Sequence, residues 1–113
     1  MIRIVLTFGD SGLLKTLTSQ GHANRTTDLP SEACAGVSVL LRTAARLFSH
    51  TDGIEIIGGA EREGHLELEV LDVSDRYHEW FRGTVDMLML GLRDLQEEYP
   101  GSIQIKTTDV RKR

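Results

Sequence analysis

Two long stretches with apolar residues at helical spacing constrain the fold of this chain more than any other feature. The spacing predicts one helix over residues 31–50 and a second, of about 25 residues, from Asp75 to the helix-stopping Tyr99-Pro100-Gly101. The apolar positions are Val37, Leu40, Leu41, Ala44, Leu47 and Phe48 in the first stretch, and Tyr77, Phe81, Val85, Leu88, Leu92 and Leu95 in the second. Because each stripe covers only one face of its helix, both helices must pack against another layer.

The rest of the chain supplies that layer, because most of it alternates apolar and polar residues as strands do. The predicted strands are residues 2–8, 13–20, 53–60, 65–73 and 102–107. The second of these puts Leu13 and Leu17 on one face, with Lys15 on the same side against the pattern. Gly58 and Gly59 are interpreted as turn residues of a hairpin that joins the third and fourth strands.

The order of elements is therefore strand, strand, helix, strand, strand, helix, strand. An α+β two-layer sandwich, with both helices on one face of a mainly antiparallel sheet, satisfies both patterns. A chain of 113 residues fits one domain. We expect that domain to span residues 1–107 and residues 108–113 to form a basic tail.

Composition excludes several classes of function. The chain has 17 Asp and Glu residues against 13 Lys and Arg residues, a balance that disfavours direct binding of nucleic acid. No apolar run reaches the roughly 20 residues of a membrane span, and residues 1–8 alternate, unlike an export signal. With a single cysteine there is no internal disulfide, so a cytoplasmic protein is predicted. The histidines lack paired ligand spacing, so we expect no metal and no cofactor.

The aromatic residues of the second helix have a simpler interpretation. Tyr77 and Phe81 lie on the apolar stripe and are predicted to be core residues. Trp80 lies off the stripe and is left open, with a contact between two copies of the chain as one alternative.

The only cysteine, Cys34, is the strongest candidate for chemistry. If Ser31 caps the first helix, Cys34 falls in its first turn, where free backbone N–H groups favour a negative sulfur. A thiol attacks as the thiolate, and lowering a pKa by two units takes about 2.7 kcal/mol. A helix terminus supplies only about 0.3–1 kcal/mol, so a nucleophilic thiol also needs a base beside it.

His22, at the end of the second predicted strand, is the natural base. It would take the thiol proton and later return it to a leaving amine. Gly21, just before it, allows a close approach of the backbone. The polar run of residues 24–28 is typical of a mobile loop, which could fold over a bound peptide chain. Ser38, one helical turn after Cys34, is expected in the same neighbourhood. The non-catalytic alternative is that Cys34 is a small buried apolar residue and that His22 is an ordinary surface residue.

Three sequence segments resemble one known family, the ribosomal-processing cysteine proteases (Prp). They are "GHA" at 21–23, "CAGVS" at 34–38 and "GTVDMLMLGLRDLQEEYP" at 83–100, in the order and at the spacing of the family. The resemblance implies a cysteine endopeptidase with His22 as general base and Cys34 as nucleophile, on a two-layer α+β fold that forms a homodimer. It also implies a substrate, the precursor of a large-subunit ribosomal protein, from which a short N-terminal extension is removed.

The chain departs from the family pattern just before the cysteine. The family usually has an aspartate three residues before it, where this chain has Ser31, and "IV" where this chain has Glu32 and Ala33. Serine caps a helix about as well as aspartate, but it cannot orient a histidine by charge. Asp28 is the candidate replacement. The supporting residues expected at the site are thus Gly21, Ala23, Asp28, Ser31 and Ser38.

Two other classes of function compete with the protease. One is a non-catalytic module that binds the ribosome or an assembly factor through residues 23–33, and it predicts an ordinary thiol. The other is a redox sensor, which ranks last because the chain has no resolving cysteine.

Overall fold

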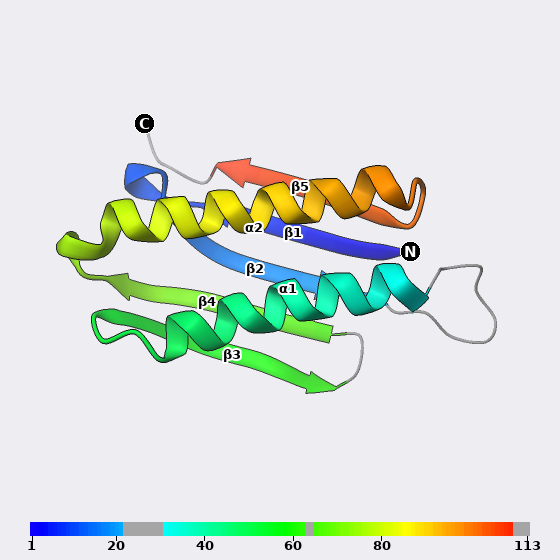
Figure 1. Ribbon diagram of the computed structural model, residues 1–113. Coiled ribbons are helices and arrows are strands. Elements are labelled where there is room, and N and C mark those ends of the chain that lie inside the picture. Colours follow the sequence, from blue (N-terminus) through cyan, green and yellow to red (C-terminus); the bar gives the residue numbers. More distant parts are fainter. Residues whose placement is uncertain (22–30, 63–64, 110–113) are drawn as a thin grey trace.

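The computed structural model describes residues 1–21, 31–62 and 65–109. Five strands and two long helices follow one another in the predicted order (Figure 1). The elements are β1 (Ile2–Phe8), β2 (Leu14–Gln20), α1 (Ser31–Ser49), β3 (Ile54–Arg62), β4 (His65–Val73), α2 (His78–Glu98) and β5 (Ile103–Asp109), with short 3-10 turns at Asp10–Gly12 and Asp75–Tyr77.

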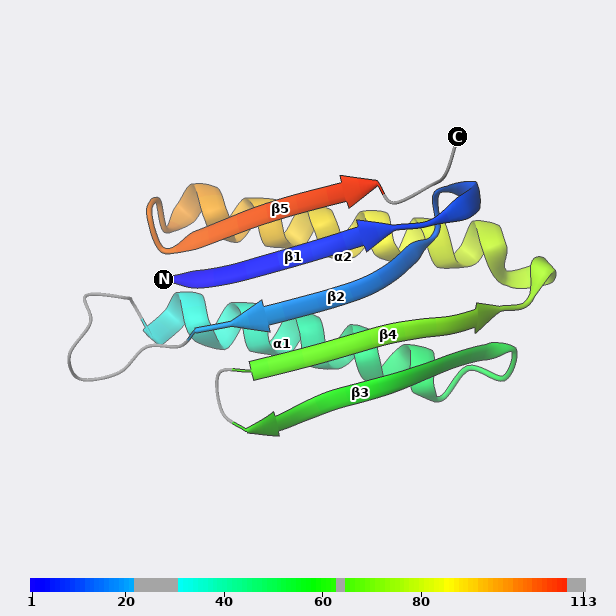
Figure 2. The ribbon, with the colours of Figure 1, turned by 180° about the vertical axis from the view of Figure 1, so that it is seen from behind.

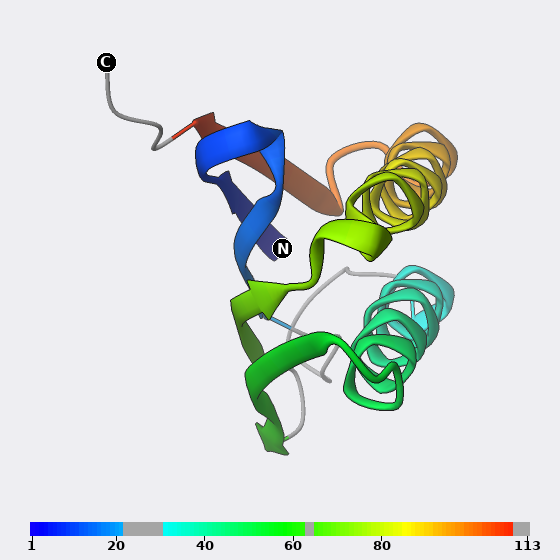
Figure 3. The same cartoon turned by 90° about the vertical axis from the view of Figure 1, so that its left-hand side faces the viewer.

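The strands form one sheet in the order β3-β4-β2-β1-β5. All neighbours are antiparallel except β1 and β5, which run parallel with Ile2 opposite Ile103. The two helices lie antiparallel to each other over one face of this sheet, and Figure 2 shows the other face without helical cover. The end-on view separates the two layers (Figure 3). The predicted α+β sandwich of order ββαββαβ is therefore confirmed.

The core fills the space between the helices and the sheet. It is built from the inward residues of every strand and the facing stripe of each helix. On α1, Val37, Leu41, Ala44 and Phe48 are buried as predicted, whereas Leu47 is 40% exposed. At 3.6 residues per turn, Leu47 lies about 80° around the helix from Val37, which turns it away from the sheet.

One prediction for β2 was wrong in phase. We expected Leu13 to face the core, but Leu14 is buried at 2% exposure and Leu13 only partly. The register of β2 against β1 shifts between Thr7 and Phe8, leaving Lys15 as an extra, exposed residue. A bulge of this kind reverses the inward and outward alternation, so the pattern violation at Lys15 marked the bulge.

The glycines predicted as turn residues lie inside a strand. Gly58 pairs with Leu68 and Gly59 pairs with Glu67, so β3 continues through them. A Cβ on Gly58, at φ +110°, would lie 2.2 Å from the carbonyl oxygen of Glu67. Glycine is therefore required there by close approach of two strands and not by a turn. At the other edge, β5 runs to Asp109, beyond the predicted end of the domain at residue 107.

The two helices meet closely where glycine faces leucine. A Cβ on Gly36 would lie 2.9 Å from Leu95 Cδ2, and a Cβ on Gly91 would lie 3.0 Å from Leu40 Cδ1. These contacts bring the start of α1 against the end of α2. At the opposite end of the helical layer, the ring centroids of Phe48 and Phe81 are 4.7 Å apart.

Trp80 and Tyr77 extend that aromatic pair toward solvent. The Trp80 ring meets Phe48 edge-on at 6.5 Å and Tyr77 at 5.9 Å, while 40% of Trp80 stays exposed. Phe81 is a core residue as predicted, and Tyr77 is partly buried against the core.

Candidate active site

Cys34 lies in the first turn of α1, as the sequence predicted. The helix begins at Ser31, so Cys34 is within the turn whose backbone N–H groups have no partner inside the helix. Ala33 beside it is fully buried, while Cys34 is a free, partly buried thiol packed against the core. The helix therefore anchors the sulfur without closing it off from solvent.

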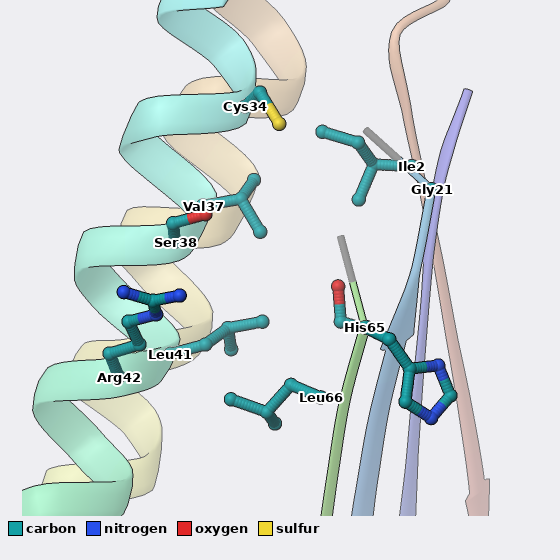
Figure 4. Close-up of a pocket in the computed structure, with 10 residues that line it drawn as sticks. Ile2, Gly21, Cys34, Val37, Ser38, Leu41, Arg42, His65 and Leu66 are labelled. Atoms are coloured by element: carbon teal, nitrogen blue, oxygen red, sulfur yellow. The ribbon is translucent and has the colours of Figure 1, made fainter. Parts of the chain in front are cut away.

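The thiol opens into a hollow between α1 and the sheet. Figure 4 shows the Cys34 sulfur pointing away from the helix, toward Ile2 of β1. The hollow is lined by Ile2, Ser19, Gly21, Cys34, Val37, Ser38, Leu41, Arg42, His65 and Leu66. Its floor is apolar, since Val37, Leu41 and Leu66 are buried. The polar lining residues Ser38 and Arg42 lie along α1.

Gly21 fixes the end of β2 at this hollow. Its φ is +104°, and a Cβ placed on it would lie 2.3 Å from the carbonyl oxygen of Met1. Only glycine allows β2 to end in so close a contact with the start of β1. His22 is bonded directly to a residue that lines the hollow, but His22, Ala23 and Asp28 all lie outside the described residues.

None of the three described histidines presents its ring to Cys34. His65 lines the hollow, yet its imidazole points to the far side of the strand (Figure 4), where Nε2 lies 3.5 Å from Glu67. His78 donates from Nε2 to the Val73 carbonyl oxygen at 2.9 Å. His50 follows the last turn of α1, about 24 Å along the helix from Cys34 at 1.5 Å per residue.

Arg42 also lines the hollow, and it was not predicted from the sequence. Cys34, Ser38 and Arg42 follow one another at intervals of four residues, so they rise along one side of α1. Ser38 was predicted to be near Cys34, and it does line the same hollow. The four-residue interval, extended by one more step, is the signal that identifies Arg42.

Tyr99, which follows α2, lies near the first turn of α1. Desolvation, together with the carboxylates of Glu98 and Glu32, raises the pKa of the Tyr99 phenol above its usual value. Because Glu32 belongs to α1 and Tyr99 follows α2, this effect reflects the closeness of the two helix ends. The phenol therefore stays protonated near neutral pH.

The described residues offer no other obvious reaction centre. In the part of the chain that the structure describes, no group of three or more His, Cys, Asp or Glu side chains is placed to hold a metal ion. Neither α1 nor α2 has the length and apolar character needed to cross a bilayer. Cys34 and its hollow are thus the candidate site.

Comparison with known proteins identifies the family. The family model described as "Cysteine protease Prp" matches residues 1–104. The chain belongs to the Prp cysteine protease family. The match covers β1 to β4, both helices, the first two residues of β5 and every residue that lines the hollow around Cys34.

Solved structures share the fold of this Prp family member. The essential ribosomal processing protease Prp from S. aureus is similar in two complexes, one with a substrate peptide (TM-score 0.78, 18% identity) and one with a covalently linked product peptide (TM-score 0.76, 19% identity). Each match covers 96% of this chain and 100% of the other. SMU.848 from Streptococcus mutans matches with a TM-score of 0.75 and 18% identity, over 96% of this chain and 95% of its own. No curated protein matches the chain significantly.

Proposed function

We propose that this protein is a cysteine endopeptidase in which Cys34 is the nucleophile and His22 the general base. One observation carries the proposal: the Cys34 sulfur opens into a hollow that is also lined by Gly21, the residue bonded to His22. The positions of His50, His65 and His78 support the choice of His22, because none of their rings faces the sulfur.

The reaction follows from these two groups. His22 takes the proton of the Cys34 thiol, and the resulting thiolate attacks the carbonyl carbon of the scissile peptide bond. The tetrahedral intermediate collapses as imidazolium gives the proton to the leaving amine, which leaves a thioester on Cys34. His22 then deprotonates a water molecule that attacks the thioester, and the sulfur departs with the proton as a free thiol. The products are two peptides, one with a new carboxylate.

The first turn of α1 stabilises the oxyanion of both tetrahedral intermediates. Backbone N–H groups at a helix start point outward and carry the positive end of the helix dipole. In this proposal, attack by Cys34 places the reacting carbonyl beside those N–H groups. The negative charge of the oxyanion then develops next to hydrogen-bond donors that are already in position. Removal of one such donor typically costs about 100- to 1,000-fold in kcat, a useful scale for this contribution.

The remaining predicted residues take supporting roles in this proposal. Asp28 orients the His22 ring in place of the aspartate that the family carries at the position of Ser31. Ser31 is the first residue of α1, and Ala23 leaves room for the peptide beside His22. Ser38 offers its hydroxyl to the bound peptide from the wall of the hollow.

The substrate is the precursor of a large-subunit ribosomal protein, cut in the cytoplasm during ribosome assembly. Support comes from the family match and from the S. aureus relative, a ribosomal processing protease seen with substrate and product peptides. We further propose a homodimer. Its support is the outer face of α2, where Met87 is 73% exposed and Leu90, on the next turn, is 63% exposed.

Cleavage of a precursor peptide by three variants tests the proposed pair. Cys34→Ala and His22→Gln should each lose at least about a thousandfold in kcat/KM, because members of a catalytic pair act as a unit. His50→Gln is the matched control, since His50 is exposed at the far end of α1 and this variant should cleave normally. Retained activity in Cys34→Ala would refute the proposed nucleophile.

The pH dependence of alkylation separates the protease from a non-catalytic ribosome-binding module. A thiol paired with a histidine reacts with iodoacetamide at a rate that is already high near about pH 6 and depends on His22. An isolated thiol gains reactivity only as the pH approaches about 8.5. The second profile in the wild-type protein, together with absence of cleavage, would favour the binding module.

A further inference from the structure

Arg42 is the one permanently charged residue among the described residues that line the hollow. The remaining lining is apolar or uncharged, and the imidazole of His65 is turned to the far side of the sheet. Arg42 is exposed, and it forms no ion pair or hydrogen bond within the ranges 1–21, 31–62 and 65–109. Its guanidinium is thus free to bind a ligand at this position.

The place of Arg42 on α1 sets its distance from the sulfur. Eight residues of helix separate it from Cys34, a rise of about 12 Å. Side chains on a helix lean toward its N-terminus, and Figure 4 shows the Arg42 guanidinium reaching back along α1 toward Ser38. An extended peptide advances about 3.3 Å per residue. The guanidinium therefore lies about two to three peptide residues from a bond held at Cys34.

The chemistry of the guanidinium selects the ligand. Arginine presents a planar fork of N–H donors that fits a carboxylate with two parallel hydrogen bonds. The protein as a whole is acidic, with a formal net charge of −4, while the lining of the hollow includes this cation. A carboxylate on a bound peptide would gain from this local charge, whereas a lysine at the same place would be repelled.

From these observations we propose that Arg42 is a specificity-determining residue that favours peptides carrying Asp or Glu two to three residues from the cleaved bond. This inference rests on the proposed peptidase function. An exposed ion pair gives a modest effect, so the expected preference for an acidic over an amide side chain is about three- to tenfold in kcat/KM.

Matched peptides test the preference. Starting from one peptide that the wild-type protein cleaves, we would place Glu, Gln or Lys in turn at each position within three residues of the cleaved bond. The wild-type protein should cleave the Glu peptide about three- to tenfold faster than the Gln peptide at one of those positions, and the Lys peptide slowest. The advantage should shrink as salt screens the pair.

Two substitutions and one control assign the preference to Arg42. Arg42→Gln should remove the Glu advantage while leaving cleavage of the Gln peptide within about twofold of wild type, and Arg42→Glu should turn the preference toward Lys. Arg46→Gln is the control, because Arg46 lies one turn further along α1, is exposed and does not line the hollow. It should keep the Glu advantage.

The outcomes distinguish failure of this inference from failure of the proposed function. Equal cleavage of the Glu, Gln and Lys peptides by the wild-type protein would overturn the role of Arg42 and leave the peptidase intact. A Glu advantage that persists in Arg42→Gln would overturn that role as well. Full activity in Cys34→Ala would instead overturn the peptidase itself.

Discussion

The two ends of the helical layer are built differently. At one end, Phe48 and Phe81 are fully buried with ring centroids 4.7 Å apart, and Trp80 covers them. At the other end, the start of α1 carries small residues, Ala33, Cys34 and Gly36 among them, and Gly36 packs against Leu95 of α2. Large rings fill space at the first end, while small side chains leave a hollow at the second.

This difference separates stability from chemistry. Large aromatic residues contribute most to stability by burying apolar area, and they leave little room for a ligand. Small residues at a helix start contribute little burial, but they leave room beside the sulfur and the free N–H groups. We therefore expect changes at the aromatic end to reduce folding stability and changes at the cysteine end to reduce activity.

Phe81→Ala should give the largest loss of stability. Removing a fully buried ring costs about 3–5 kcal/mol in free energy of unfolding. Urea denaturation followed by circular dichroism measures the change. Trp80→Ala is the comparison, and it should cost less because 40% of Trp80 is already exposed. Equal losses of unfolding free energy for the two variants would contradict the distinction between the buried ring of Phe81 and the partly exposed ring of Trp80.

Gly21→Ala should reduce both folding stability and activity, because Gly21 lies at the end of β2 and also lines the hollow. The strained φ of +104° and the overlap with the Met1 carbonyl should together cost about 2–3 kcal/mol in free energy of unfolding. Activity per folded molecule should also fall by more than about tenfold, since the end of β2 must move. Gly12→Ala is the control: its φ is +70°, but nothing lies within 4 Å of the added Cβ. It should lose only about 1 kcal/mol and keep its activity.

Gly83→Ala should stabilise the protein by about 0.5–1 kcal/mol. Gly83 is exposed within α2, nothing lies within 4 Å of an added Cβ, and alanine favours the helix more than glycine does. Thermal unfolding at several protein concentrations measures the effect. A lower Tm that depends on concentration would instead indicate that this face of α2 is covered in a homodimer.

The smallest expected effect is a pH dependence from Tyr99. Desolvation and the nearby carboxylates of Glu98 and Glu32 raise the pKa of this phenol, so the folded protein holds its proton where the unfolded chain releases it. The resulting stabilisation is complete below about pH 10 and is lost as the pH rises through the raised value. Tyr99→Phe should flatten the fall of stability above about pH 10, as measured by urea midpoints. Identical slopes for the two proteins would contradict this origin.

The sequence predicted the architecture well because both periodicities are strong in this chain. The prediction failed where local geometry interrupts the two-residue alternation of a strand. The bulge at Lys15 exchanged Leu13 for Leu14 in the core, and Gly58 stayed within β3 because a neighbouring strand approaches closely. Neither a bulge nor a close approach between strands is encoded by alternation alone.

For the candidate site, the sequence placed Cys34 correctly in the first turn of α1. We did not predict Arg42, which continues the four-residue interval of Cys34 and Ser38 but becomes part of a hollow only when α1 packs over the sheet. The approach of β2 to Met1 at Gly21 is likewise a tertiary contact. The pairing of His22 with Cys34 stays a prediction, since His22 lies outside the described residues.

The parallel pairing of β1 with β5 has a consequence for synthesis. Ile2 pairs with Ile103, so the two partners come from opposite ends of the sequence. Until β5 has been synthesised, the backbone N–H and C=O groups on one side of β1 have no strand to pair with. An open edge of this kind can pair with another chain, so slow translation or truncation before β5 should promote aggregation.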